Sequence, residues 1–125
     1  MTAFPAIVDL LSAAESLQDY WSPKVVARVN DQYVKVAKLR GSFTWHSHAD
    51  EDELFYVLRG HLKIEYEGGR VVDLPAGALH VVPRGVLHNP VAEDECCIAL
   101  VETVTTKHTG DRETSLTKSI ADQLA

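Results

Sequence analysis

The feature that most limits the fold of this chain is a series of short strand-forming segments, separated by turn signals roughly every ten residues. The segments read FTWHSH, ELFYVLRG, LKIEY, RVVDL, LHVVP and CCIALVETV. A Gly68-Gly69 pair and a turn from Pro83 to Gly85 separate some of them. Short strands at such regular spacing predict an all-β sandwich or barrel.

The two ends of the chain differ from this central pattern. Residues 24–39, KVVARVNDQYVKVAKL, carry an Asn-Asp pair between two valine-rich runs and predict a β-hairpin. Before them, apolar residues at helical spacing follow Asp9, a helix-capping residue type, and predict one short helix over about residues 9–20. The polar tail, about residues 110–125, is predicted to be an arm or a frayed helix.

Length and charge narrow the class of protein. A chain of 125 residues is the size of one domain, so we expect a single domain, residues 1–125, with a barrel core of about residues 24–105. Lysine and arginine number 12 against 18 aspartates and glutamates, and the net charge of −6 argues against a nucleic-acid partner. The first residues lack the basic start of a secretory signal, and no apolar run is long enough to cross a bilayer. We therefore expect no membrane partner and a cytoplasmic location.

Two cysteines, Cys96 and Cys97, are adjacent in the sequence. On a strand, neighbouring side chains point to opposite faces, so a disulfide between these two would be strained. We predict two reduced thiols, one in the core and one in a minor pocket or an interface, rather than a redox pair.

Two histidines separated by one residue indicate a different kind of chemistry. On a strand, His46 and His48 would point from the same face. Glu53 begins the next apolar run, and His88 follows the turn from Pro83 to Gly85. Packing the two hairpins face to face would bring His88 against the other three side chains. Three imidazoles and a carboxylate suit a divalent first-row metal and leave one or two coordination positions open, although an isolated His-x-His pair is also common on a polar strand face.

Two segments resemble the motifs of the cupin family. Residues 41–60, GSFTWHSHADEDELFYVLRG, resemble the first cupin motif, and residues 77–88, GALHVVPRGVLH, resemble the second. The positions that match are Gly41, His46, His48, Glu53 and Gly60, then Gly77, Pro83, Gly85 and His88. The resemblance implies a cupin double-stranded β-helix, or jelly-roll barrel, that holds one divalent transition metal per chain on the three histidines and the glutamate. Manganese, iron, nickel or zinc would suit this ligand set.

Two classes of function are compatible with these features. The first is a metal-dependent cupin that binds a small polar molecule on the metal, acting as an isomerase or lyase, or as an oxygenase with iron. The second is a non-catalytic small-molecule binding or sensing module. Small cupins of this kind are often labelled as resembling mannose-6-phosphate isomerase, but a shared fold does not establish a shared activity. His80, close in sequence to His88, is the candidate proton-transfer residue, with a solvated strand residue as the alternative.

The alternation of side chains along a strand predicts which way the aromatic residues near the histidines point. If His46 points inward, Phe43 and Trp45 are predicted to face away from the pocket, where they would form the interface of a homodimer or, as the alternative, be covered by the N-terminal segment. Phe55 and Val57 share the parity of Glu53 and are predicted to line the pocket wall.

The remaining polar residues are less constrained. His61 and His108 lie near turns and are predicted to be surface residues. Lys35, Lys38 and Arg40 lie where the apolar phase of the strand slips, so the sequence does not indicate which basic side chain, if any, enters the barrel.

Overall fold

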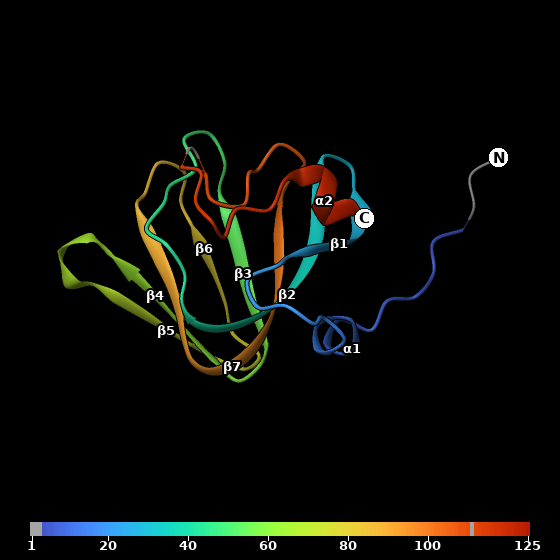
Figure 1. Cartoon of the computed structure of the whole chain (residues 1–125), viewed down its shortest axis with the longest axis horizontal. Coiled ribbons are helices and arrows are strands. Elements are labelled where there is room, and N and C mark those ends of the chain that lie inside the picture. Colours follow the sequence, from blue (N-terminus) through green and yellow to red (C-terminus); the bar gives the residue numbers. More distant parts are fainter. Residues whose placement is uncertain (1–3, 111) are drawn as a thin grey trace.

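The computed structural model describes residues 4–110 and 112–125, which form an antiparallel β-barrel with two short helices (Figure 1). The strands and helices, in chain order, are α1 (Leu10–Glu15), β1 (Lys24–Val29), β2 (Gln32–Ser42), β3 (Glu53–Arg59), β4 (His61–Tyr66), the 3-10 turn η1 (Glu67–Gly69), β5 (Val71–Pro75), β6 (Leu79–Val82), β7 (His88–Thr103) and α2 (Ile120–Leu124). This is the double-stranded β-helix that the sequence predicted.

The long strand β7 holds the barrel together because it pairs with β2, β3 and β4. Its first residues pair with β4, and residues 97–101 lie between β2 and β3. Gly60 approaches the bend between these two parts so closely that a Cβ atom there would lie 2.8 Å from the carbonyl oxygen of Glu95. Sequence patterning predicted a strand only from Cys96 onward, because the residues before it include Pro90 and three acids.

The hairpin and the first helix follow local sequence signals. β1 and β2 are joined by a two-residue turn with Asn30 at a φ of 52°, as a tight hairpin requires. The Asp9 side chain caps α1 by accepting a hydrogen bond from the Ser12 backbone N–H at 3.0 Å. The helix ends at Glu15, earlier than predicted, and the turns that follow bring Trp21 into the barrel core.

Apolar side chains form two clusters on the two faces of the sheet. The larger cluster fills the barrel and includes Leu62, Ile64 and Cys96. The smaller one, with Val36 and Cys97, lies under α1. Both thiols are free and buried on opposite faces, as predicted. Burial, followed by the neighbouring Cys97, raises the pKa of Cys96 to about 12, so this thiol stays protonated.

The C-terminal segment packs against the barrel rather than extending as a free arm. α2 lies beside β1, and its Gln123 side chain is completely buried (Figure 1). Gly110 approaches the segment that carries His46 and His48, since a Cβ atom at this position would lie 1.9 Å from the carbonyl oxygen of Ser47. This contact ties the C-terminal segment to the histidine pair.

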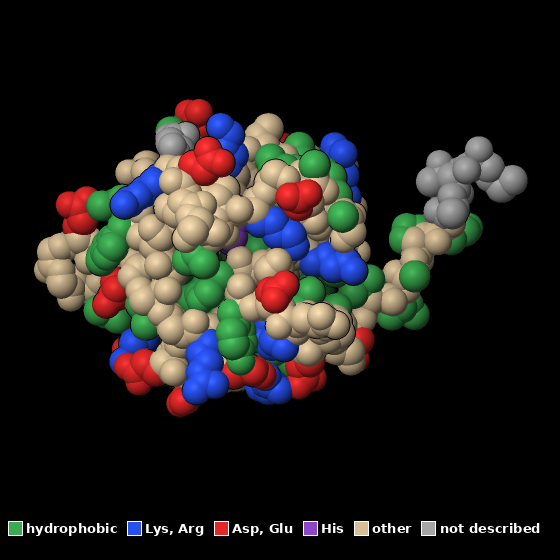
Figure 2. Space-filling view, viewed as in Figure 1, with side chains coloured by type: hydrophobic (Ala, Val, Ile, Leu, Met, Phe, Trp, Pro, Cys, Tyr) green, Lys and Arg blue, Asp and Glu red, His purple; other side chains and the backbone are tan. Residues whose placement is uncertain are grey.

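The surface in Figure 2 mixes basic and acidic side chains, and a histidine is visible in a depression near the middle of that face. None of the helices in residues 4–110 and 112–125 is long and apolar enough to span a bilayer. The assignment of residues 1–125 to one domain stays a prediction.

We predict that Gly110→Ala destabilises the protein more than Gly68→Ala does. Both glycines have a positive φ, so each alanine adds backbone strain of roughly 1–2 kcal/mol. Only at Gly110 does the new methyl group also collide with backbone, which adds about 1–3 kcal/mol. Urea unfolding of the two variants measures the difference. Equal losses of stability would show that the C-terminal segment does not pack tightly on Ser47.

Candidate metal centre and ligand cavity

The four predicted ligand residues lie together inside the barrel. His46 forms an isolated bridge with His88, in which each backbone N–H donates to the other's carbonyl, at 3.0 and 2.9 Å. Glu53 is the first residue of β3, and the Gly85 N–H donates to the His48 carbonyl at 2.7 Å. All four side chains are buried, and one potential ligand atom from each lies within 4.8 Å of the others.

Backbone carbonyls orient two of the imidazoles. The Nδ1 atom of His46 lies 2.8 Å from the Thr44 carbonyl oxygen, and that of His88 lies 3.0 Å from the Val86 carbonyl oxygen. A carbonyl oxygen only accepts, so Nδ1 carries the proton in both rings. Each Nε2 therefore presents a lone pair, which is the form that binds a metal.

The donor set leaves buried polar atoms that a cation would satisfy. Glu53 Oε1 lies 3.5 Å from Nε2 of both His48 and His88, which is too long for a normal hydrogen bond. Within the described part of the chain, Glu53 Oε1 and His88 Nε2 are buried without a hydrogen-bond partner. Such atoms are costly in an apolar interior, and these four residues can hold a metal ion.

Protonation in the site suits metal binding at neutral pH. Burial, and next the nearby His88, lower the pKa of His46 to about 4, so its imidazole is neutral. Burial raises the pKa of Glu53, but a hydrogen bond from Glu102 and the neighbouring histidines outweigh it and hold this pKa well below its usual value. Neutral imidazole and carboxylate are the ligand forms that divalent metals bind.

A buried polar chain, which the sequence did not predict, lies behind Glu53. Lys35 on β2 places its ammonium 2.6 Å from Glu102 Oε1 and 2.5 Å from Gln123 Oε1. Burial, and next the charge of Glu53, raise the pKa of Glu102 well above its usual value, which favours the protonated form of Glu102 beside the Glu53 carboxylate. Lys35 is thus the basic side chain that enters the barrel.

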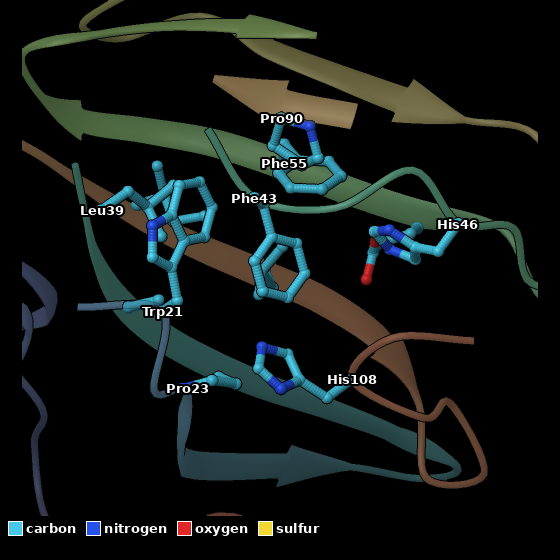
Figure 3. A pocket seen from close by; sticks show the side chains of 12 residues that line it. Trp21, Pro23, Leu39, Phe43, His46, Phe55, Pro90 and His108 are labelled. Carbon is cyan, nitrogen blue, oxygen red and sulfur yellow. The ribbon is translucent and has the colours of Figure 1, made fainter. Parts of the chain in front are cut away.

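A small cavity of about 30 Å³ lies beside His46 and Glu53 (Figure 3). His46 and Glu53 contribute to its wall, together with His108 and nine apolar residues. Those nine are Trp21, Pro23, Ala37, Leu39, Phe43, Phe55, Pro90, Ile98 and Leu100. The cavity therefore offers a polar region near the histidines and an apolar enclosure elsewhere.

Phe43 lines this cavity, contrary to the parity prediction. Its ring stacks on Trp21 at a centroid distance of 4.7 Å and contacts His46 edge-on at 5.5 Å (Figure 3). Alternation fails here because β2 ends at Ser42 and the chain is irregular up to His46, so strand geometry does not apply. Phe55 lines the wall as predicted, whereas Val57 is buried in the barrel core and is not among the residues that line the cavity. Trp45 is half-buried beside a separate groove, and its role in an interface stays a prediction.

The other histidines have different surroundings. His61 is exposed and lies 3.1 Å from Asp73, as a surface residue would. His108 was expected at the surface but is half-buried in the cavity wall, because the segment after β7 folds back over the barrel. His80 on β6 lies 2.7 Å from the hydroxyl of Tyr66 in a neighbouring groove, and its catalytic role stays a prediction.

Comparison with known proteins identifies the family. Residues 32–102, more than half of the chain, match the cupin domain. The chain belongs to the cupin family. This range contains all four candidate ligands and both motifs that resembled cupin sequences.

Several relatives resemble this cupin over most of its length. The uncharacterized protein YdbB of Bacillus subtilis (strain 168) is 34% identical over 80 residues, which are 64% of this chain and 71% of YdbB. A cupin-2 domain containing protein from Shewanella frigidimarina is 38% identical, with a TM-score of 0.74, over 78% of this chain and 94% of the other. KdgF from Halomonas sp. is 32% identical, with a TM-score of 0.55, over 65% of this chain and 78% of KdgF.

We predict that Lys35→Met lowers the free energy of unfolding by about 1–3 kcal/mol, the cost of leaving buried polar groups without a donor. Because the raised pKa of Glu102 favours its protonated form, we expect the loss to stay below the roughly 3–5 kcal/mol of an abandoned buried charge. Urea denaturation measures the change. The control is Lys63→Met, which breaks a surface pair with Glu93 and should have little effect. A loss in the larger range would mean that Glu102 is buried as a carboxylate.

Proposed function

We propose that this cupin holds one divalent transition metal, manganese, iron, nickel or zinc, on His46, His48, Glu53 and His88, and binds a small organic molecule beside it. The observation that supports the proposal is the convergence of four buried donor atoms within 4.8 Å of one another. Three neutral imidazoles and one carboxylate would fill four positions and leave room for an exogenous ligand.

A purely structural polar cluster explains the site less well. Such a cluster would pair its buried atoms with one another, whereas the shortest Glu53 distances to His48 and His88 are 3.5 Å. Lys35 also supplies its positive charge to Glu102 rather than to Glu53 directly. The centre therefore brings several hydrogen-bond acceptor atoms close together. A bound cation would stabilise this arrangement.

The cavity supports a particular kind of small molecule. Its walls are mostly aliphatic and aromatic, with Trp21 stacked on Phe43, so they would contact the apolar part of a ligand. Polar atoms of the ligand would lie at the end beside His46 and Glu53. A bound divalent metal would act there as a Lewis acid that polarises a ligand oxygen. The aromatic wall excludes water, and the barrel holds the donor residues in fixed orientations.

Binding alone and catalysis differ in one requirement, a group that moves a proton. His80 stays the proposed group for an isomerase or lyase reaction, with the Tyr66 hydroxyl 2.7 Å from its Nε2. His80 is not among the residues that line the cavity beside His46, and this position favours the binding or sensing alternative. The cytoplasmic location stays a proposal.

We predict about one divalent metal per chain in the purified protein, and a large loss of metal in His46→Ala and in His88→Ala. Each substitution removes one of four donors from a site that is otherwise preformed. Elemental analysis after dialysis measures the ratio. His61→Ala is the matched control, because His61 is exposed and paired with Asp73 far from the cluster. Unchanged metal content in both cluster variants would contradict the proposal.

We also propose that the protein is a homodimer. Phe4 and Ile7 are fully exposed on an extended N-terminal segment that projects from the barrel, and Leu79 and Val81 are exposed on β6 (Figure 1). Burying large apolar side chains of this kind contributes roughly 1.5–3 kcal/mol each. We predict a two-chain mass by light scattering at tens of micromolar. The double variant Phe4→Ser/Ile7→Ser should shift the protein toward monomer, whereas a monomeric wild type would rule the dimer out.

A further inference from the structure

His108 occupies a distinctive position in the cavity wall. It follows β7, and the centroid of its ring lies 4.9 Å from the centroid of the Phe43 ring (Figure 3). In this view one ring nitrogen is directed toward the space beside Phe43 and Trp21. Apart from His46 and Glu53, His108 is the polar residue among those that line the cavity in the described part of the chain.

A hydrogen bond fixes which nitrogen of His108 is protonated. The Lys118 backbone N–H donates to His108 Nδ1 at 2.9 Å. A backbone N–H cannot accept, so Nδ1 must present its lone pair and the neutral ring carries its proton on Nε2. Burial lowers the pKa of His108 to about 4, which agrees with a neutral ring. His108 therefore offers an N–H donor from its far nitrogen.

The C-terminal segment holds this tautomer in place. The Lys118 ammonium donates to Ser22 Oγ and to the Pro23 carbonyl, both at 3.0 Å. Gln123 Nε2 donates to the Lys118 carbonyl at 2.9 Å. The residue that orients His108 is thus attached to the segment beside Trp21 and to the buried Gln123, and this leaves little freedom for the ring to turn.

Phe43 contacts His46 edge-on, with ring centroids 5.5 Å apart, and contacts the tilted ring of His108 at 4.9 Å, so it adjoins both histidines (Figure 3). A molecule lying along Phe43 thus has the metal-ligating histidines at one end and the Nε2–H group of His108 at the other. We propose that His108 determines ligand specificity by donating a hydrogen bond to an oxygen at the end of the ligand opposite its metal-binding group. This inference rests on the proposed function. The ligand class is a flat apolar body with chelating oxygens at one end and a carbonyl or similar acceptor at the other.

Two probes that differ at the far end test the proposal. Catechol carries two adjacent oxygens, and 3,4-dihydroxyacetophenone adds a ketone on the opposite side of the same ring. Calorimetric titration into zinc-loaded protein under nitrogen gives both dissociation constants, and zinc is used because it is redox-inactive and does not oxidise the probes. We predict that the preference for the ketone over catechol falls about fivefold or more in His108→Phe, while zinc content is unchanged.

Two further variants complete the comparison. His108→Gln retains an N–H donor and should keep part of the preference. The control His61→Phe removes an exposed histidine and should keep all of it. In wild-type protein, the ketone and not catechol should shift the Nε2–H signal of His108 in imidazole nitrogen NMR spectra, a result that does not depend on how the variants fold.

The outcomes separate this proposal from the metal site. The same preference in wild type and His108→Phe, or an unmoved His108 signal, overturns the role of His108 and leaves the metal site standing. Retained zinc with no binding of either probe overturns the ligand class and with it this proposal. Failure of the wild type to retain zinc would instead remove the proposed function itself.

Discussion

The backbone bridge between His46 and His88 is the constraint on which the site depends. It joins the segment just after β2, which carries His46 and His48, to His88, the first residue of β7. Together they provide three of the four candidate ligands. Backbone hydrogen bonds define this distance more sharply than side-chain packing would, because their geometry tolerates little variation. Since β7 continues from His88 through both halves of the barrel, the candidate metal centre is built on the most extensively paired strand.

A second set of contacts in the barrel interior depends on charge rather than on strand pairing. Glu53 concentrates negative charge in a buried place, and the usual solution would be an adjacent cation. Here Glu102 lies between Glu53 and Lys35. The Glu53 carboxylate therefore interacts with Glu102, and the Lys35 ammonium contacts Glu102 instead of Glu53. This arrangement keeps Glu53 ionised without filling the space beside it with an ammonium group. It also connects the centre to Gln123 near the end of the chain.

Sequence reasoning reached the fold, the family and the four clustered residues, because each depends on local signals: strand alternation, turn residues and two short motifs. It missed Lys35 and His108, and it assigned Phe43 to the wrong face. Lys35 looks like any strand lysine until strand pairing with β7 brings Glu102 within 2.6 Å of its ammonium. Phe43 follows the end of β2, where alternation no longer holds. His108 depends on a C-terminal segment whose composition shows no periodicity, and only long-range packing positions it.

The cavity is therefore assembled from two sources with different constraints. Its inner wall comes from β-strands that also position the candidate ligands, so a substitution there disturbs both metal and ligand binding. Its outer wall comes from Trp21, Pro23 and His108, which lie on connecting segments joined to one another through Lys118. Such segments change with less cost to stability than paired strands do. The outer wall can therefore change with less disturbance of the four clustered residues than the inner wall can, even though the Trp21 backbone N–H donates to the Lys38 carbonyl of β2 at 2.9 Å.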